Sequence, residues 1–245
     1  MRIGTCSDVG KTRPINEDNF YVSEYVRRPG ALYAMVADGM GGHNAGETAS
    51  GAAVEEVSDF INEYFSDQIP PQQVRDLLTA AINSANKLIY AGAQDNVKLS
   101  GMGTTLTLCF LYGTQATVAH VGDSRAYIIR EEMIHKITED HSLVAELLRN
   151  GQITPEQARN HPQKNVITRA VGTDPSVEID IYEFEVKAND IILLCTDGLS
   201  NQLSDQEMYH LICEADSMEE AAAALVDAAN EKGGLDNITA VLLEI

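Results

Sequence analysis

Three aspartates that lie far apart in the sequence each stand at the end of an apolar, strand-like run. Asp38 follows ALYAMVA, Asp197 follows IILLCT, and Asp236 opens DNITAVLLE. A carboxylate at the mouth of a strand is costly unless something pairs with it. Three carboxylates that converge in one cleft would offer the oxygen ligands that a hard divalent cation prefers. We therefore expect these three aspartates to form a cation site.

A second set of chemical groups lies close to the N-terminus. The segment RPINED, from Arg13 to Asp18, holds one guanidinium and the two carboxylates of Glu17 and Asp18. An arginine is suited to bidentate capture of a phosphate group. The carboxylates are suited to a metal ion or to its water ligands. Taken alone, the segment is more typical of a polar turn before a strand.

The loop that follows Asp38 is rich in glycine. The string DGMGGHNAG contains four glycines and His43, and it leads from a strand into a long helix. Glycines allow close approach of a backbone, and the amides of a helix N-terminus attract an anion. The loop lacks the Lys-Ser/Thr of a Walker A motif, and Asn44 replaces the last glycine of GxGxxG. A plain Asp-Gly turn is the alternative, but it does not explain four glycines.

Other short segments place polar residues beside strands. HVGDSR puts Asp123 in a loop between two strands, which makes it one more carboxylate near a strand end. SGMGTT, residues 100–105, is more typical of a tight turn before a core strand, and TEDHS, residues 138–142, of a helix cap. Each signal is weak when it is taken alone.

The elements that must position these groups follow from the hydrophobic pattern. Alternating, β-rich runs predict strands at Asn19–Val26, Ala31–Ala37, Thr104–Tyr112, Gln115–Val121, Arg125–Arg130, Val177–Val186, Asp190–Cys195 and Ile238–Glu244. Helical periodicity predicts helices at Ala45–Phe65, Pro71–Ala91, Leu143–Asn150, Pro155–His161, Asp205–Glu214 and Met218–Lys232.

The order of these elements indicates the fold class. Tight turns around residues 112–115 and 130–133 predict hairpins, so much of the sheet is expected to be antiparallel. Helix pairs stand as blocks between runs of strands, which favours a layered α+β domain over an alternating βαβ fold. We expect one domain that spans residues 1–245. Its least regular part, residues 140–172, is predicted to form a flap over the site.

Composition disfavours several classes of partner. The chain has 37 acidic and 17 basic residues, a formal net charge of −20. Nucleic acids and anionic membrane surfaces both favour clusters of Lys and Arg, so neither is an expected partner. No apolar run approaches the roughly 18 residues of a membrane span. The N-terminal segment lacks the apolar core of a signal peptide, and four scattered cysteines fit no zinc or disulfide pattern. We expect a cytoplasmic monomer.

Eight segments occur in the order and spacing of one known family. The match runs from Arg13 to Thr239, and the segments are RPINEDN, VADGMGGHNAGE, SGMGTT, HVGDSRAY, TEDHS, HPQKNVITRAVG, CTDGLSN and GLDNITAV. In these segments the chain resembles the bacterial metal-dependent serine/threonine protein phosphatases of the PP2C (PPM) family. The resemblance implies a four-layer α-β-β-α sandwich, in which helix pairs flank two antiparallel sheets and a two-metal site lies at one end.

The resemblance also implies which residues hold the ions. Asp38 would bridge two Mn²⁺ or Mg²⁺ ions. Asp197 and Asp236 would hold the first ion, and the Gly39 carbonyl would hold the second. Oxygen ligands of this kind favour Mg²⁺ or Mn²⁺ over Zn²⁺.

The remaining residues of the implied site surround these ions. Glu17 and Asp18 would support metal-bound waters, and Asp123 would form a weaker third ion site together with Asp197. Arg13 would bind the phosphate of the substrate. The implied reaction is hydrolysis of phosphoserine and phosphothreonine on cytosolic proteins by a water that bridges the two ions. The chain would thereby oppose a serine/threonine kinase.

One position departs from the family pattern. Eukaryotic members have a histidine directly after the Asp-Gly that matches Asp38-Gly39, and it is assigned as the general acid. This chain has Met40 there, and His43 follows three residues later. Two candidates for the proton donor to the leaving group stay open: His43 and a metal-bound water.

Two other functions belong to related proteins. A pseudophosphatase binds partners without chemistry, and such proteins lose metal ligands that are present here. A phosphatase of an anti-sigma pathway usually carries a sensory domain, for which 245 residues leave no room. We therefore expect an active protein phosphatase.

Overall fold

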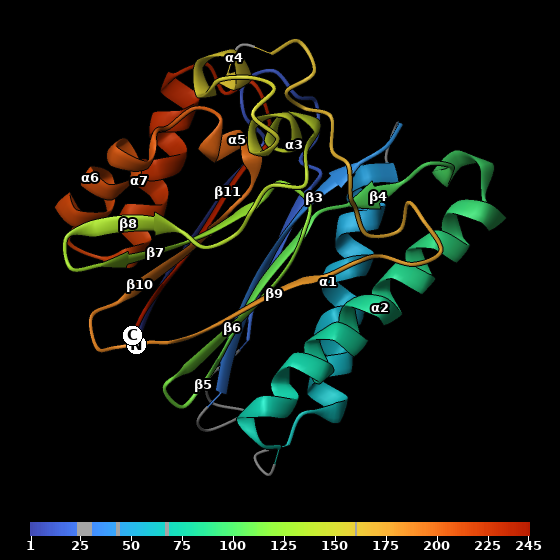
Figure 1. Ribbon diagram of the computed structural model, residues 1–245, viewed down its shortest axis with the longest axis horizontal. Helices are drawn as coiled ribbons and strands as arrows, with labels where there is room; N and C mark the ends of the chain where they lie inside the picture. Colours follow the sequence, from blue (N-terminus) through green and yellow to red (C-terminus); the bar gives the residue numbers. More distant parts are fainter. Residues whose placement is uncertain (24–30, 43–44, 67–68, 160) are drawn as a thin grey trace.

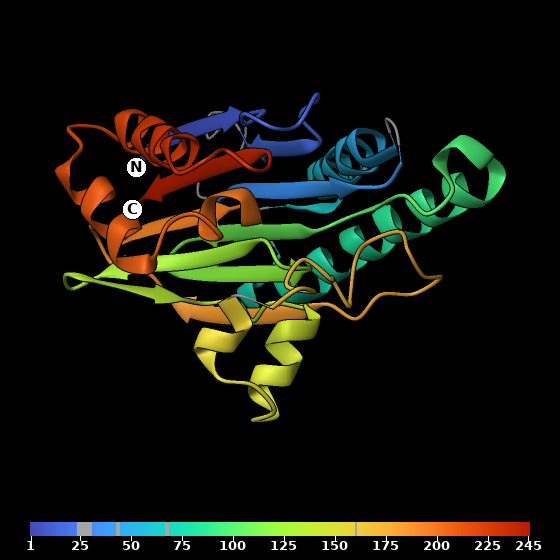
Figure 2. The same cartoon turned by 90° about the horizontal axis from the view of Figure 1, so that it is seen from above.

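Two antiparallel sheets pack face to face, and a helix pair covers the outer face of each sheet (Figures 1 and 2). The computed structural model describes residues 1–23, 31–42, 45–66, 69–159 and 161–245. The apolar faces of sheets and helices must be buried against another layer. In this stack of four layers, each sheet packs against the other sheet and against one helix pair. The expected α+β sandwich of four layers is confirmed.

The first sheet has the strand order β1-β11-β10-β7-β8. Its strands are β1 (Arg2–Asp8), β11 (Ile238–Glu244), β10 (Ile191–Cys195), β7 (Arg125–Arg130) and β8 (Met133–Lys136). The helices α6 (Asp205–Glu214) and α7 (Met218–Glu231) cover its outer face. Because β1 pairs with β11 along its length, the two chain ends lie side by side.

The second sheet has the order β2-β3-β5-β6-β9. Its strands are β2 (Asp18–Val22), β3 (Ala31–Met40), β5 (Leu106–Tyr112), β6 (Gln115–Val121) and β9 (Asp180–Glu185), and the short β4 (Gly103–Thr104) pairs with the end of β3. The helices α1 (Ala45–Tyr64) and α2 (Pro71–Asp95) cover this sheet.

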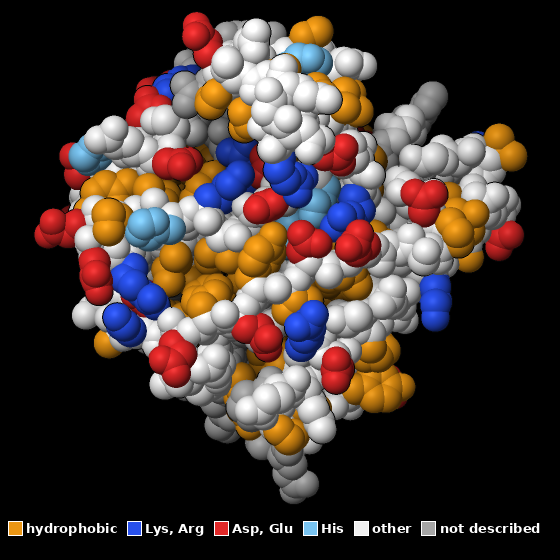
Figure 3. Space-filling model, viewed as in Figure 1, with side chains coloured by type: hydrophobic (Ala, Val, Ile, Leu, Met, Phe, Trp, Pro, Cys, Tyr) orange, Lys and Arg blue, Asp and Glu red, His pale blue; other side chains and the backbone are white. Residues whose placement is uncertain are grey.

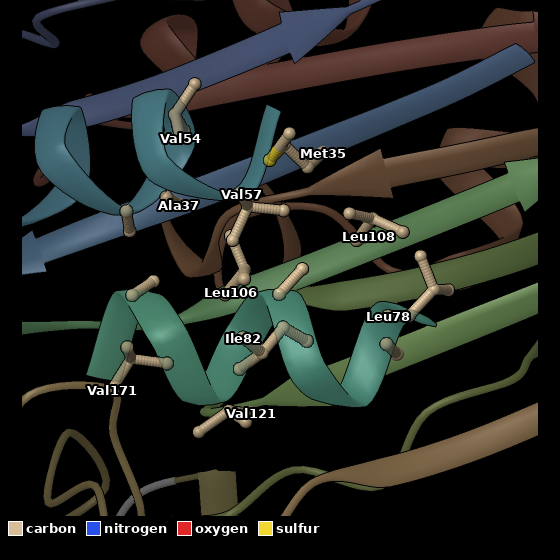
Figure 4. Close-up of a cluster of buried hydrophobic side chains, with 14 of the residues drawn as sticks. Met35, Ala37, Val54, Val57, Leu78, Ile82, Leu106, Leu108, Val121 and Val171 are labelled. Atoms are coloured by element: carbon tan, nitrogen blue, oxygen red, sulfur yellow. The ribbon is translucent and has the colours of Figure 1, made fainter. Parts of the chain in front are cut away.

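The strand β3 is buried on both faces because it lies between two apolar layers. Met35 points toward the helices and packs with Val57, Ile82 and Leu106 in the cluster of Figure 4. Its neighbour Val36 belongs to the separate cluster between the two sheets. A strand that is buried on both faces reads as a continuous apolar run, as ALYAMVA does.

Several helices begin at a residue whose side chain caps the first turn. At α6, Ser204 accepts the N–H of Glu207, and the Glu207 carboxylate accepts the N–H of Ser204. The same reciprocal pair occurs between Thr154 and Gln157 at α4 (Pro155–Arg159). At α7 only half of such a pair forms: Ser217 accepts the N–H of Glu220, but the Glu220 carboxylate accepts the N–H of Asp216.

The segment from 140 to 172 stands apart from the sandwich. It contains α3 (Leu143–Arg149), α4 and irregular chain, and in Figure 2 its two helices project beyond the sheets. Ser142 caps α3 by accepting the N–H of Ala145, as the TEDHS string predicts. This segment is called the flap below.

Some elements differ from the sequence prediction. The strand β1, the single turn of α5 (Asp197–Ser200) and the 3-10 turn Val97–Leu99 were not predicted. The strand β8 was predicted only as the second arm of the hairpin around residues 130–133, without bounds of its own. The predicted strand Asn19–Val26 is observed to Val22, and residues 24–30 lie outside the described part of the chain. Among the described helices, none combines the length and the hydropathy that a membrane crossing requires.

Candidate active site

Five aspartates from both sheets converge at one end of the sandwich. In the second sheet, Asp18 on β2 lies directly opposite Asp38 on β3. In the first sheet, Asp197 follows β10, and Asp236 precedes the adjacent strand β11. Asp123 lies in the loop from β6 to β7, where the chain crosses from one sheet to the other. Charge repulsion from the other four acts on the Asp38 carboxylate, so the five lie close together.

Two threonines hold Asp18 at the junction of the sheets. Its Oδ2 accepts hydrogen bonds from the hydroxyls of Thr196, at 2.8 Å, and Thr239, at 2.7 Å. Thr196 lies at the end of β10 and Thr239 on β11, so these bonds join the edge of one sheet to the centre of the other. The position of Asp18 is therefore fixed by both sheets.

Four carboxyls of the cluster have a raised pKa when no cation is near. Burial raises the pKa of Asp18 to about 7, that of Asp197 to about 6 and that of Asp123 to about 8, and repulsion among the aspartates adds to each rise. The pKa of Asp38 is raised well above its ordinary value for the same two reasons. A cation among these groups would offset their mutual repulsion and stabilise their ionised forms.

Buried carboxylate oxygens without a hydrogen-bond partner mark the places in the cluster that suit a cation. One carboxylate oxygen on each of Glu17, Asp18, Asp123 and Asp197 is buried and has no hydrogen-bond partner within the described part of the chain. A buried carboxylate oxygen without a donor is costly. The cluster therefore fits oxygen-binding cations such as Mg²⁺ or Mn²⁺.

The spacing of the carboxylates limits how many of them one ion can contact. No three His, Cys, Asp or Glu side chains of the described residues are close enough to hold one ion. Asp236 is engaged elsewhere, because its Oδ2 accepts from Arg13 Nη2 at 2.8 Å and its Oδ1 from the N–H of Asn237 at 2.9 Å. Mg²⁺ usually keeps several waters and takes one or two carboxylates, so at the present spacing waters would complete its ligand set.

The glycine loop gives Glu17 room beside the first turn of α1. A Cβ atom on Gly46 would lie 2.4 Å from Glu17 Oε1, and a Cβ on Gly39 would lie 2.1 Å from the Gly46 carbonyl oxygen. Both distances are far below van der Waals contact. The glycines at 39 and 46 are thus required by close packing between β3, α1 and the Glu17 carboxylate.

Arg13 lies at the exposed rim of the cluster. Its side chain is 47% exposed, and its one ion pair among the described residues is with Asp236. A guanidinium at this place can reach an anion that arrives from solvent while it stays next to a carboxylate of the cluster.

A cavity of about 700 Å³ leads from the cluster to the flap. Asp123 and Asp197 line one end, Val144 and Leu148 on α3 line a second wall, and the first turn of α6 lines the third. On the face that Figure 3 shows, Lys, Arg, Asp, Glu and His side chains gather near the flap.

The base of the flap is tied to the loop that carries Asp123. His141 Nδ1 accepts the N–H of Gly122 at 3.0 Å, and the His141 N–H donates to the Gly122 carbonyl at 2.7 Å. Arg125 binds Asp140 through Nε and Nη2, as a bidentate pair. These contacts involve the residue just before Asp123 and the residue two positions after it.

The structure brings together most of the residues that the sequence singled out. Asp38, Asp197, Asp236, Asp18 and Asp123 share one cluster, and Glu17, Gly39 and Arg13 adjoin it. His43 lies outside the described residues. The hydroxyls of Thr196 and Thr239 were missed, because a threonine beside a strand end carries no sequence signal that separates it from ordinary strand formers.

Known proteins resemble this chain along nearly its whole length. The family model described as protein phosphatase 2C matches residues 11–242. The serine/threonine phosphatase stp of Listeria monocytogenes is 40% identical over 238 residues, which are 97% of this chain and 93% of that protein.

Solved structures show the same similarity in three dimensions. The serine/threonine phosphatase of S. agalactiae has a TM-score of 0.92 and 35% identity, with coverage of 100% of this chain and 99% of the other. The catalytic domain of the protein phosphatase PstP, solved in complex with two manganese ions, has a TM-score of 0.86 and 34% identity, with coverage of 99% and 97%.

Proposed function

Because the chain belongs to the protein phosphatase 2C family and is therefore a protein phosphatase, we propose that it hydrolyses phosphoserine and phosphothreonine in proteins with two divalent cations. The observation that carries this proposal is the buried carboxylate cluster with its four unpaired oxygens. The relative solved with two manganese ions supports Mn²⁺ as the metal, and Mg²⁺ is the alternative.

The proposed ligands follow the geometry of the strand ends. Asp38 would be a ligand of both ions, Asp197 and Asp236 would hold the first, and the Gly39 carbonyl would hold the second. Because no three such side chains of the described residues are close enough to hold one ion as they stand, binding of the first ion would draw its three carboxylates together. When bound, two such ions lower the pKa of a water between them and orient it toward phosphorus. Asp236 is at present paired with Arg13, so ion binding requires this carboxylate to exchange or share its partner.

Other carboxylates around these ligands would bind metal-bound waters or a further ion. We assign to Glu17 and Asp18 the role of hydrogen-bond acceptors for waters around the ions, since each has a buried oxygen without a donor. Asp123, which also has one, would hold a third ion together with Asp197. The roles of Glu17 and Asp18 agree with the preference of Mg²⁺ and Mn²⁺ for water ligands.

Arg13 is proposed to anchor the substrate phosphate. Its guanidinium has five N–H donors, and the contact with Asp236 occupies Nη2. No other hydrogen bond of this guanidinium to the described residues is seen, so its remaining donors can form a charge-assisted pair with phosphate oxygens. The leaving serine or threonine oxygen requires a proton, for which His43 and a water remain the two candidates.

The cavity beneath the flap supports a protein substrate. A volume of about 700 Å³ accommodates several residues around the phosphorylated one, and its walls combine apolar side chains of α3 with polar groups of α5 and α6. We propose that the flap selects among phosphoproteins.

The cysteines bear on the cellular compartment in which the protein works. The four described cysteines are all free, which is typical of the reducing cytoplasm. We propose that the chain works there as one domain and as a monomer, against a serine/threonine kinase that phosphorylates the same proteins.

The substrate class is tested with three peptides of one sequence that carry phosphoserine, phosphothreonine or phosphotyrosine. With Mn²⁺ present, we expect phosphate release from the first two and little from the third. Asp38→Asn should abolish release and leave folding intact. Binding of the phosphopeptides without any release by the wild type would instead indicate a pseudophosphatase.

A further inference from the structure

The turn before β5 holds the backbone of Asp38 from both sides. The Asp38 N–H donates to Thr105 Oγ1 at 2.9 Å, and the Asp38 carbonyl accepts the N–H of Thr105 at 2.9 Å. The hydroxyl of Thr104 donates to the same carbonyl at 2.9 Å. Both threonines are fully buried. The peptide groups of Asp38 are thus held by a segment that lies 66 residues further along the chain.

The Thr105 hydroxyl also reaches the loop that carries Asp123. Its Oγ1 lies 2.7 Å from Ser124 Oγ, and Ser124 is the residue directly after Asp123. Ser124 is fully buried as well. A Cβ atom on Gly122 would lie 2.5 Å from Thr105 Cγ2, so the loop is packed tightly against this threonine on its other side.

One hydroxyl therefore serves two loops at once. Thr105 Oγ1 accepts the N–H of Asp38, and it shares one proton with the hydroxyl of Ser124. A hydroxyl can accept and donate together, whereas a methyl group of similar size can do neither. Because Thr105 and Ser124 are both fully buried, the loss of either bond leaves a buried polar group unsatisfied.

We propose that Thr105 is a positioning residue that fixes the spacing between the carboxylates of Asp38 and Asp123. Through Asp38 it would fix the positions of the two core metal ions. Through Ser124 it would fix the position of the third metal ion. This inference rests on the proposed function, because it assumes that both carboxylates hold ions. Partners that orient metal ligands typically contribute about 10–100-fold in metal affinity or activity.

The test compares four variants by calorimetric titration of the metal-stripped protein with Mn²⁺. Thr105→Val removes the hydroxyl at nearly constant shape, and Thr105→Ser restores it. Ser124→Ala removes the same hydrogen bond from the other side. Thr117→Val is the matched control, since Thr117 is a buried threonine in the middle of β6, opposite Phe110 and Glu183.

We expect Thr105→Val to weaken Mn²⁺ binding roughly 10–100-fold at every occupied site, and Thr105→Ser to recover most of it. Ser124→Ala should weaken only the weakest ion, and Thr117→Val should bind as the wild type does. On a phosphopeptide, Thr105→Val should lower kcat more than it changes KM, because Arg13 still binds the phosphate.

Three results would overturn the inference. Wild-type Mn²⁺ affinity in Thr105→Val would do so, as would an equal loss in Thr105→Val and Thr117→Val. If Thr105→Val does not fold, unchanged binding of all ions in Ser124→Ala would count against it. A wild-type protein that binds no Mn²⁺ would contradict the proposed function itself, and this outcome is distinct from the other three.

Discussion

At the scale of single residues, His120 shows how burial controls protonation beside the site. Its Nε2 lies 3.0 Å from the Glu139 carbonyl oxygen, and its Nδ1 lies 2.9 Å from the Thr107 hydroxyl. A carbonyl only accepts, so Nε2 carries the proton and Nδ1 accepts from Thr107. Burial, followed by repulsion from His141, lowers the pKa of His120 to about 3.

We predict that His120 makes the protein less stable as the pH falls. The unfolded chain takes up a proton on this histidine near pH 6.5, whereas the folded chain does not do so until about pH 3. The unfolded state therefore binds more protons between these values, and stability decreases as the pH falls through this window. From pH 7 to pH 5 the loss from this residue is about 2 kcal/mol.

The measurement is urea unfolding of the wild type and His120→Gln at pH 7 and pH 5. Glutamine retains one donor and one acceptor but does not titrate, so its loss of stability should be smaller by about 2 kcal/mol. His135→Gln, at an exposed position on β8, serves as the control and should behave as the wild type does. Parallel losses in all three proteins would contradict the prediction.

Some residues of the site could be predicted from the sequence and others could not. Asp38, Asp197 and Asp236 were predictable because a carboxylate at the end of an apolar run is an exception to ordinary burial. Thr105 was not, because GTT before a strand is typical of a turn. Its role depends on the Asp38 N–H and the Ser124 hydroxyl, and neither is near it in sequence.

At the scale of elements, α2 holds the end of the flap through one amide. Asn86 is buried on α2; its Oδ1 accepts the N–H of Gly172 at 2.7 Å, and its Nδ2 donates to the Asp174 carbonyl at 3.0 Å. Gly172 has φ +90°, and a Cβ there would lie 2.1 Å from Ile89 Cγ2. The chain at the end of the flap is thus held in a fixed position against α2.

We predict that Asn86→Ala lowers the free energy of unfolding by about 2 kcal/mol, because it removes two hydrogen bonds and leaves the buried Gly172 N–H without a partner. Denaturant unfolding measures this loss. Asn83→Ala on the same helix is the control, since the Asn83 amide donates to Thr79 within α2 and its loss should cost far less. An equal loss of unfolding free energy in both variants would show that the contacts of Asn86 with Gly172 and Asp174 are unimportant.

The flap should control substrate choice more than it controls chemistry. We predict that replacing residues 150–163 with a short glycine–serine linker changes the ranking of phosphopeptides by kcat/KM. Turnover of p-nitrophenyl phosphate, which is too small to reach the α3 wall, should change much less. Equal effects on both kinds of substrate would count against a selective role.

The pattern of predicted and missed elements has a physical origin. The helices α1, α2, α6 and α7 were predictable because each has an apolar face and a clear beginning. In β1, which pairs with β11, Ile3 and Cys6 lie among polar and small residues in RIGTCSD, so no alternation of period two appears. The turn α5 has four residues, fewer than periodicity can detect.

At the scale of the whole molecule, the sandwich places its least favourable charges where both sheets end. The chain has a net charge of −20, and five aspartates gather at one place without an equal number of cationic side chains. Self-repulsion of this kind destabilises a fold, and a phosphate dianion would add to it. Two divalent cations would offset both effects at once.

The most direct test of this account is turnover of p-nitrophenyl phosphate by the metal-stripped protein as Mn²⁺ is added back. The account predicts no turnover without metal and recovery with Mn²⁺. Asp38→Asn and Asp236→Asn should each lower the recovered activity by more than about 100-fold while they remain folded. Turnover in the presence of a chelator, or wild-type activity in either variant, would contradict a reaction that depends on ions held by these carboxylates.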